Sequence, residues 1–304
     1  MYIILIVIAV IVFATLIFIL YEKYEQNTIK VTSYEVGTKF KNSKDLKIVQ
    51  ISDLHSKCFG ENNIDLINKI NEIKPNIIIL TGDIIDRDSL NYDVERELLK
   101  KLAKKYDVYY VLGNHEITLK YINLKEYLVE LKTLGVEILL NDKVEVNKNV
   151  DLYGINYYPK DRENMKILQI NNLLKNVDEE KINIVLIHDP NDIQILKKYK
   201  VDFAFAGHVH GGVIRLFKKG LLSPDAKFFP KYFSGKYKVE NTDLYVSSGL
   251  SGKGLSNIRI HNKPEIIVFY LRKNVVRRII EKKNWNAFEV KYGTSKLFWK
   301  WRWK

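Results

Sequence analysis

The feature that most constrains this chain is a set of five short apolar runs, each of which ends in Asp, Asn or His side chains. Such runs, rich in Ile, Val and Leu, are typical of strands buried on both faces of a sheet. The carboxyl ends of parallel strands meet at one edge of a sheet, so we expect the polar residues to meet there too. The runs are 46–51, 77–80, 108–112, 184–187 and 203–206, and the residues that follow them are Asp53, His55, Asp83, Asn114, His115, His188, His208 and His210.

Asp53 and His55 show why this pattern indicates a metal site. Residues i and i+2 that leave a strand point the same way, so both side chains can reach one point. Carboxylate oxygen and imidazole nitrogen together suit a divalent transition metal. Taken singly, each residue has an ordinary structural role: Asp83 could cap a helix, Asn114 could occupy a left-handed turn, and His188 could be a core histidine. Together, those roles would leave Asp and His clustered at one edge with nothing to neutralise them.

The remaining pattern predicts a mixed α/β domain. Helices are expected at 62–73, 92–105, 124–134 and 165–174, with Asp192 as the N-cap of a further short helix. The runs 136–140, 144–146 and 152–155 are expected to form antiparallel strands, and 31–36 an edge strand. The glycine- and aromatic-rich stretch 213–237 is expected to be a long loop over the site. Cys58, the single cysteine, could be a soft ligand but is expected to be an ordinary loop residue, as is His261.

The N-terminal run from Tyr2 to Tyr21 contains no charged residue and is long enough to cross a bilayer. A cleaved signal peptide would have a basic start and a small-residue cleavage site, which this run lacks. A buried core helix is rarely apolar on every face. We therefore predict an uncleaved single-pass anchor at 1–22, a polar connector at 23–45, a catalytic domain at 46–272 and a C-terminal tail at 273–304.

The net charge of +13 is concentrated in that tail, where eleven Lys or Arg lie against Glu281 and Glu289 between Leu271 and Lys304. The last nine residues also hold three of the four Trp residues, which favours contact with a membrane surface. The alternative is that these Trp pack on the domain and the charges are solvated. A nucleic-acid groove would spread its charge over the domain, so nucleic acid is not the expected partner.

As a set, Asp53-x-His55, Gly82-Asp83, Gly113-Asn114-His115-Glu116, His188 and Gly207-His208-x-His210 resemble the calcineurin-like metallophosphoesterase superfamily. The resemblance covers about 46–271. Further pieces at 222–224, 229–232, 245–249, 258–259 and 264–266 resemble a bacterial branch of exported or membrane-associated phosphodiesterases that are compared with UDP-2,3-diacylglucosamine hydrolase. This branch implies a cell-membrane protein with its catalytic domain outside the cytoplasm, although the charges flanking the anchor do not fix its orientation.

The resemblance implies a four-layer αββα sandwich with two divalent metal ions, Mn, Fe or Zn, at one edge. One ion would take Asp53, His55, Asp83 and His210, and the other Asp83, Asn114, His188 and His208, with Asp83 bridging through its two oxygens. His115 would stabilise the phosphate or protonate the leaving group, and Asn114, His115 and Arg215 are expected to contact substrate.

The implied reaction is hydrolysis of a phosphodiester or pyrophosphate, lipid-linked substrates included, by metal-activated hydroxide. A nuclease or nucleotide phosphodiesterase of the same fold is the alternative, since Arg215, Lys218 and Lys219 could hold a polynucleotide. A non-catalytic interaction module is an alternative of another class, but such a module would lack a ligand, and none is missing here. The oligomeric state is not predicted.

Overall fold

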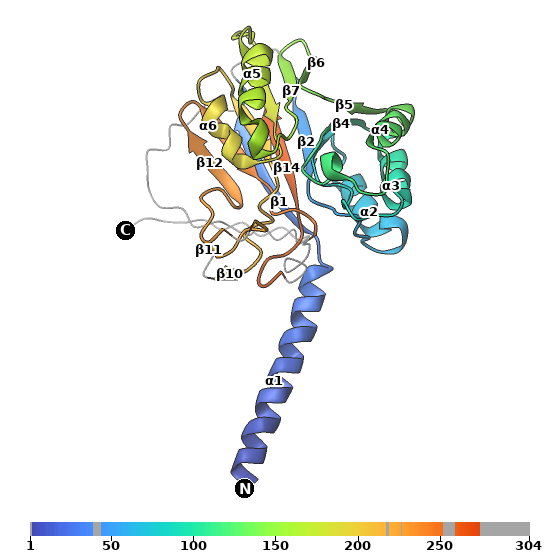
Figure 1. Ribbon diagram of the computed structural model, residues 1–304, viewed down its shortest axis with the longest axis vertical. Helices are drawn as coiled ribbons and strands as arrows, with labels where there is room; N and C mark the ends of the chain where they lie inside the picture. The colour runs from blue at the N-terminus through green and yellow to red at the C-terminus, as the bar shows by residue number, and fades with distance from the viewer. Residues whose placement is uncertain (1, 39–43, 217–218, 226, 252–258, 274–304) are drawn as a thin grey trace, which may run out of the picture.

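The core of the protein consists of two six-stranded β-sheets packed face to face (Figure 1). A computed structural model describes residues 2–38, 44–216, 219–225, 227–251 and 259–273. The first sheet has the order β1 (Lys30–Gly37), β14 (Glu265–Arg272), β2 (Leu46–Ile51), β3 (Ile77–Thr81), β4 (Asp107–Val111) and β5 (Val136–Ile138). The second has the order β12 (Gly235–Val239), β13 (Thr242–Val246), β9 (Phe203–Ala206), β8 (Ile182–Leu186), β7 (Val150–Gly154) and β6 (Asp142–Asn147).

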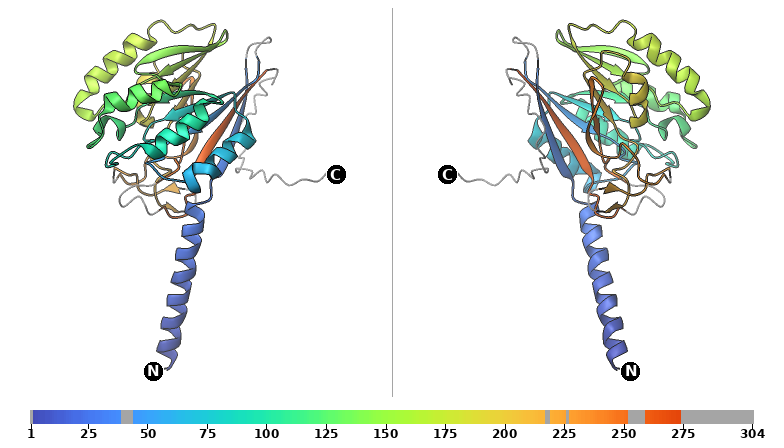
Figure 2. Two further views of the ribbon diagram at one scale, coloured as in Figure 1. Left: turned by 90° about the vertical axis from the view of Figure 1, so that its right-hand side faces the viewer. Right: turned by 90° about the vertical axis from the view of Figure 1, so that its left-hand side faces the viewer.

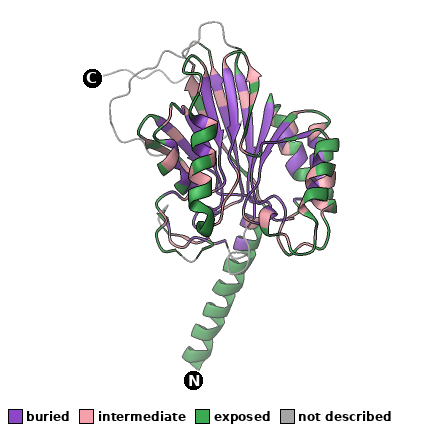
Figure 3. Cartoon of the chain, turned by 45° about the horizontal axis from the view of Figure 1, so that its top comes forward, coloured by how far each residue is buried: buried purple, intermediate pink, exposed green. Residues whose placement is uncertain are grey.

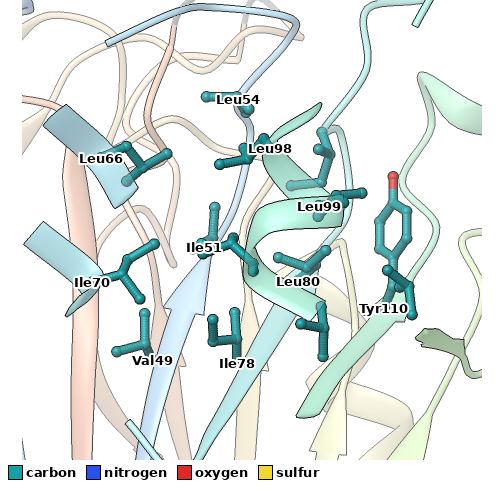
Figure 4. Close-up of a cluster of buried hydrophobic side chains, with 14 of the residues drawn as sticks. Val49, Ile51, Leu54, Leu66, Ile70, Ile78, Leu80, Leu98, Leu99 and Tyr110 are labelled. Atoms are coloured by element: carbon teal, nitrogen blue, oxygen red, sulfur yellow. The ribbon is translucent and has the colours of Figure 1, made fainter. Parts of the chain in front are cut away.

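Helices cover the outer face of each sheet and complete four layers (Figures 1 and 2). On the first sheet these are α2 (Ile64–Ile73), α3 (Asp93–Ala103) and α4 (Leu124–Thr133), and on the second α5 (Glu163–Leu174) and α6 (Ile193–Leu196). Figure 4 shows Ile70 of α2 beside Val49 of the sheet and Leu98 of α3 beside Ile51, all members of one apolar cluster. Three apolar clusters fill the three spaces between the layers, which confirms the predicted αββα sandwich.

The central strands are buried on both faces, as their unbroken apolar sequences predict (Figure 3). Strands β2, β3, β4 and β5 run parallel to one another, and so do β7, β8, β9 and β13. Their carboxyl ends therefore deliver the residues that follow them to one edge of the sandwich. We call this edge the carboxyl edge.

The prediction of three successive antiparallel strands at 136–155 is wrong in part. β6 and β7 do pair antiparallel, but β5 lies parallel to β4 in the first sheet, and β7 lies parallel to β8 in the second. The short connections suggested a meander, whereas the chain here passes from one sheet to the other. The predicted edge strand is present as β1, which pairs parallel with β14.

Asp192 does not cap the helix that it precedes. Its carboxylate instead accepts a hydrogen bond from Lys166 at 2.5 Å, and the side chain of Asp189 caps the preceding 3-10 turn by accepting from the backbone N–H of Asn191 at 2.9 Å. Two acidic residues lie at this turn, and the sequence does not show which of them faces α5.

The N-terminal helix α1 (Tyr2–Gln26) projects away from the sandwich (Figures 1 and 2). It is long and apolar enough to cross a membrane, and its apolar residues are exposed along its length. Only Glu22 and Glu25, near its C-terminal end, are buried. The 274–304 part of the predicted tail lies outside the described residues.

Candidate metal centre

The carboxyl edge brings together every Asp and His side chain that the sequence predicts as a metal ligand. Two groups of side chains there could each hold a metal ion, with ligand atoms within 4.8 Å of one another. The first group is Asp53, His55, Asp83 and His210, and the second is Asp83, His188 and His208. Asp83 belongs to both groups.

The backbone of five of these residues is strained. Asp53, His55, Asp83, His208 and His210 all have φ between 46° and 68°, in the left-handed region that side chains with a Cβ rarely adopt. Strain of this kind persists where the surrounding structure fixes a functional geometry. It also corrects the sequence argument, because Asp53 and His55 do not continue the extended strand. They converge because the backbone N–H groups of both bond to the loop after β3, Asp53 to Gly82 O at 3.0 Å and His55 to Asp83 O at 3.1 Å.

A single oxygen of Asp83 faces both groups. Oδ1 accepts a hydrogen bond from the backbone N–H of His115 at 2.8 Å. Oδ2 lies 3.3 Å from Nε2 of His188 in the second group and 3.8 Å from Nε2 of His55 in the first. Gly113 allows this approach, since a Cβ at that position would lie 2.3 Å from Oδ1 of Asp83.

Hydrogen bonds to the outer nitrogens of three histidines aim their other nitrogens into the centre. Nδ1 of His188 donates to Thr81 O, and Nδ1 of His210 donates to Ser251 O, both at 2.7 Å. Nε2 of His208 lies 3.3 Å from the carboxylate of Asp225. In each case the remaining nitrogen faces inward, and when that nitrogen is deprotonated its lone pair points at the centre, as in metal-bound histidines.

Asn114 adds a fourth donor to the second group. The oxygen end of its side chain faces His208 Nδ1 at 2.9 Å, His188 Nε2 at 3.0 Å and Asp83 Oδ2 at 3.3 Å. Without a cation, this oxygen lies against two other acceptors, His208 Nδ1 and Asp83 Oδ2, which favours turning the NH2 group towards them. With a cation between them, the oxygen is correctly placed as a ligand. The donor set therefore fits a divalent ion bound by mixed nitrogen and oxygen ligands.

Burial and neighbouring charges set the protonation of the centre before any metal binds. Burial lowers the pKa values of His55 and His210. Burial also opposes protonation of His188, but the Asp83 carboxylate outweighs it and raises the pKa of His188 to about 10. Burial works against ionisation of Asp83 in turn, yet its histidine neighbours hold the pKa of that carboxyl well below its ordinary value. A carboxylate thus ionises here only with positive charge beside it.

His115 lies beside the two groups and not within them. Its Nδ1 accepts a hydrogen bond from the backbone N–H of Arg87 at 3.1 Å, and its Nε2 lies 4.0 Å from Asp83 Oδ2. Because Nδ1 is an acceptor, the proton of the neutral ring lies on Nε2, which faces the centre. This position suits a group that donates a proton or hydrogen bond to a substrate.

Sequence reasoning gave no role to three carboxylates at the centre, although it named one of them, Glu116, within the motif at 113–116. Asp86 forms a third group with His55 and His115, Asp225 contacts His208, and Glu116 lies beneath Asp83. Asp86 and Glu116 stand three residues and one residue after predicted site residues, so their proximity was a usable signal. Asp225 lies in the stretch predicted to cover the site, but nothing marked it there. Its hydrogen bond to His208 holds the pKa of Asp225 well below its ordinary value.

Arg215 and Cys58 lie apart from the ligand groups. The guanidinium of Arg215 donates to Gly211 O at 2.8 Å and to Ser248 Oγ at 2.7 Å, so its contact with substrate stays a prediction. Cys58 is exposed and belongs to none of the three groups that the described residues form.

A cavity of about 610 Å³ borders the centre at His208. Basic and aromatic side chains line much of it, among them Lys160, Lys166, Lys227, Phe228 and Phe229. Asp189, Asp192 and Asp225 also line it, so its charge is mixed. The stretch 213–237 contributes one side of this cavity, from Ser223 to Tyr232. The same stretch, predicted as a long loop, also contains the short paired strands β10 (Arg215–Leu216) and β11 (Lys219–Gly220).

Comparison with known proteins identifies the family. The family model described as calcineurin-like phosphoesterase matches residues 46–212. The uncharacterized metallophosphoesterase YkoQ of Bacillus subtilis is 30% identical over 276 residues, which cover 88% of this chain and 98% of the relative. An uncharacterized metallophosphoesterase of Aquifex aeolicus is 29% identical over 261 residues, covering 83% of this chain and 95% of the relative. A solved structure of the phosphopantetheinyl hydrolase of Mycobacterium tuberculosis matches with a TM-score of 0.43 and 13% identity over 66% of this chain and 88% of that chain.

The chain therefore belongs to the calcineurin-like phosphoesterase family, and the predicted superfamily is confirmed. It is a phosphoesterase, a hydrolase of phosphoester bonds. The relatives from Bacillus subtilis and Aquifex aeolicus are named only as metallophosphoesterases, so the finer resemblance to UDP-2,3-diacylglucosamine hydrolase stays a prediction.

Proposed function

We propose that the carboxyl edge holds two divalent metal ions and that the protein uses them to hydrolyse a phosphodiester or pyrophosphate bond. The observation that carries this proposal is the position of Asp83 Oδ2 between the two ligand groups. One oxygen that faces two sets of inward-directed nitrogens suits a bridging ligand. In this proposal Asp83 would bridge through Oδ2 alone and not through both oxygens, since Oδ1 accepts the N–H of His115.

Each residue has a distinct role in this proposal. Asp53, His55, Asp83 and His210 hold the first ion, and Asp83, Asn114, His188 and His208 hold the second. Bound there, two ions lower the pKa of water and neutralise the phosphate oxygens as charge builds in the transition state. His115 directs its Nε2–H at the phosphate or at the departing oxygen. A mixed set of nitrogen and oxygen ligands fits Mn, Fe and Zn alike, so the proposal covers all three metals.

An organic substituent of the substrate phosphate occupies the cavity beside His208. Lys160 and Lys227 line that cavity and suit an anionic group, and Phe228 and Phe229 suit an apolar one. Both features agree with a phosphodiester or pyrophosphate more than with a small phosphomonoester. In this proposal α1 is a single-pass anchor in the cell membrane, and the domain at 46–272 lies outside the cytoplasm.

The substitution Asp83→Ala tests the two-metal proposal. The change removes a ligand from both ions, so we expect hydrolysis of bis-p-nitrophenyl phosphate to be lost with Mn²⁺ in excess. The variant should also bind less than one ion per chain, measured by atomic emission after gel filtration. Glu180→Gln, at an exposed position of the same domain, is the matched control and should behave as the wild type. Full activity of Asp83→Ala in saturating metal would refute the bridging role.

A further inference from the structure

The C-terminal end of α1 is held against the carboxyl edge by contacts on two sides. On one side Lys57 donates from Nζ to Gln26 O at 2.5 Å, and Lys57 stands only two residues after His55 of the first ligand group. This bond also places a cation at the C-terminal end of the helix dipole, where positive charge is stabilising.

On the other side the loop before β14 takes up the acidic residues of α1. Glu25 pairs with Nζ of Lys263 at 2.8 Å, and Glu22 lies 3.5 Å from Nδ1 of His261. Both glutamates are buried by these contacts. His261 has no place in the metal motif, and its contact with α1 gives it a structural role.

A buried arginine connects this loop to the metal centre. Arg259 donates from Nη2 to Lys263 O at 3.1 Å and from Nη1 to Ser251 O at 2.7 Å. Ser251 O also accepts the Nδ1–H of His210, a member of the first ligand group. Three hydrogen bonds, through the side chain of Arg259 and the carbonyl of Ser251, thus connect Lys263, which pairs with Glu25 of α1, to the candidate metal ligand His210.

We call the contacts of Glu22, Glu25 and Gln26 with the domain the joint. The length of α1 places the joint at the level of the lipid headgroups. Its 25 residues span about 37 Å, whereas the hydrocarbon core of a bilayer is about 30 Å thick. The first charged residues after the apolar run are Glu22 and Lys23, so the hydrocarbon ends close to Tyr21. Residues that contact Glu22, Glu25 and Gln26 must therefore lie in the headgroup layer.

The surface beside the cavity suits the same layer. Phe228 and Phe229 have 76% and 68% of their surface exposed, and Leu216 of β10 has 51%. Exposed basic residues, Lys219 and Lys227, stand among them. Figures 1 and 2 show β10 and β11 at the end of the domain from which α1 departs. Apolar rings mixed with cations are typical of surfaces that contact an anionic membrane.

We propose that the metal centre acts on a phosphoester whose phosphate lies in the headgroup layer of the membrane that α1 spans, which makes the substrate class lipid-linked. The proposal rests on the proposed hydrolytic function and adds to it where the substrate is presented. The phosphate reaches the metals at the carboxyl edge, while the apolar part of the substrate stays in the bilayer beside Phe228 and Phe229.

The first experiment measures placement without any catalysis. The full chain is reconstituted in vesicles of phosphatidylcholine and phosphatidylglycerol, and Cys58, the single cysteine, is labelled with an NBD fluorophore. Cys58 adjoins Lys57 at the joint, so a lipid with a nitroxide on its headgroup should quench the fluorophore. The matched control is Lys148→Cys in a Cys58→Ser chain, at the exposed turn between β6 and β7 on the opposite end of the domain. We expect at least twofold stronger quenching at Cys58, and equal quenching at the two positions would overturn the proposal.

The second experiment compares two substrates that release the same product. One is soluble bis-p-nitrophenyl phosphate, and the other is a dioleoyl lipid with p-nitrophenyl phosphate as its headgroup. In both, water oxygen bonds to phosphorus, the P–O(aryl) bond breaks, p-nitrophenolate leaves with the electron pair, and one proton of the water goes to solvent. The ratio of the lipid rate to the soluble rate reports how the site is presented to the membrane.

A rigid spacer then separates the site from the membrane. Ten residues of (EAAAK)₂ inserted after Gln26 lift the domain by about 15 Å, whereas ten Gly/Ser residues leave it free to return. We expect the rigid insertion to lower the lipid-to-soluble ratio at least tenfold and the flexible one to lower it much less. An unchanged ratio in the rigid variant would overturn the proposal. If the wild-type chain hydrolyses neither probe, the proposed function fails, and the quenching experiment still decides the placement.

Discussion

Glu116 supports the metal centre from below without facing it, and the substitution Glu116→Gln tests how much that support contributes. The carboxylate is fully buried. Oε2 accepts from the backbone N–H groups of Asp83 at 3.0 Å and Gly113 at 2.8 Å. Oε1 accepts from the N–H of Ile84 at 2.7 Å and from the O–H of Tyr110 at 2.5 Å. Every one of these partners is a donor, so the site requires an acceptor at both oxygens.

Glutamine has the same shape but only one acceptor oxygen. If its NH2 replaces Oε2, the N–H groups of Asp83 and Gly113 each face another donor. If the amide is reversed, Ile84 loses its acceptor, and Tyr110 must turn its O–H. An unsatisfied buried donor costs about 1–3 kcal/mol, and more beside a charged partner, so the free energy of unfolding should fall by about 2–6 kcal/mol. Metal affinity should fall roughly 10–100-fold, as it does when a residue that orients a ligand is lost.

Thermal unfolding of the full chain in dodecyl maltoside measures the first effect, and titration with Mn²⁺ measures the second. For a domain of this size each kcal/mol shifts Tm by roughly 2–4 °C, so Glu116→Gln should lower Tm by roughly 4 °C or more. The exposed control Glu180→Gln should change the free energy of unfolding by less than about 0.5 kcal/mol. If Glu116→Gln matched the control in both Tm and Mn²⁺ affinity, the argument that Glu116 fixes the Asp83 loop would be wrong.

Three further outcomes follow from the same geometry. His115→Ala should keep its metal content but lose about 10²–10⁴-fold in kcat, measured on bis-p-nitrophenyl phosphate, because His115 lies beside both ligand groups and belongs to neither. A chelator should lower Tm, and Mn²⁺ at 100 times its Kd should restore about 2.7 kcal/mol, measured by thermal unfolding. Burial raises the pKa of Glu95 from 4.5 to about 7. The folded chain therefore holds a proton that the unfolded chain loses between about pH 4.5 and 7, and the free energy of unfolding should decline over that window by on the order of 3 kcal/mol. Glu95→Gln should remove the decline in urea titrations at pH 5 and pH 8; an equal decline in the variant would show that another group causes it.

The convergence of the candidate ligands could be predicted from sequence because two regularities act on them together. Buried parallel strands have unbroken apolar sequences, and their carboxyl ends share an edge, so residues after β2, β3, β4, β8 and β9 had to meet. The local reason was different from the predicted one at Asp53 and His55, whose left-handed backbone replaces the expected extended one. The side chains of Asp53 and His55 still reach the other candidate ligands, because the order of strands in each sheet fixes where each strand ends.

Contacts between distant segments were not predictable in this way. β5 follows a short connection like a hairpin strand, yet it pairs with β4, because that pairing buries Val136 and Ile138 against α4. Asp225 reaches His208 only because the loop before β12 folds back over the carboxyl edge. The joint at Glu22 and Glu25 likewise depends on a loop more than 200 residues away in the chain. The spacing of apolar residues along the chain carries no information about such contacts between distant segments.

The two ligand groups also lie where the two sheets meet, so a bound ion would connect the sheets. His55 and Asp83 follow strands of the first sheet, whereas His188, His208 and His210 follow strands of the second. Each group contains residues from both sheets, so an ion bound to either group would link the sheets at the carboxyl edge. The apolar cluster between the sheets includes Ile48, Ile79 and Phe205 and does not depend on an ion. Removal of metal should therefore loosen the carboxyl edge and leave the sandwich folded, with faster amide hydrogen exchange confined to the residues that follow β2, β3, β8 and β9.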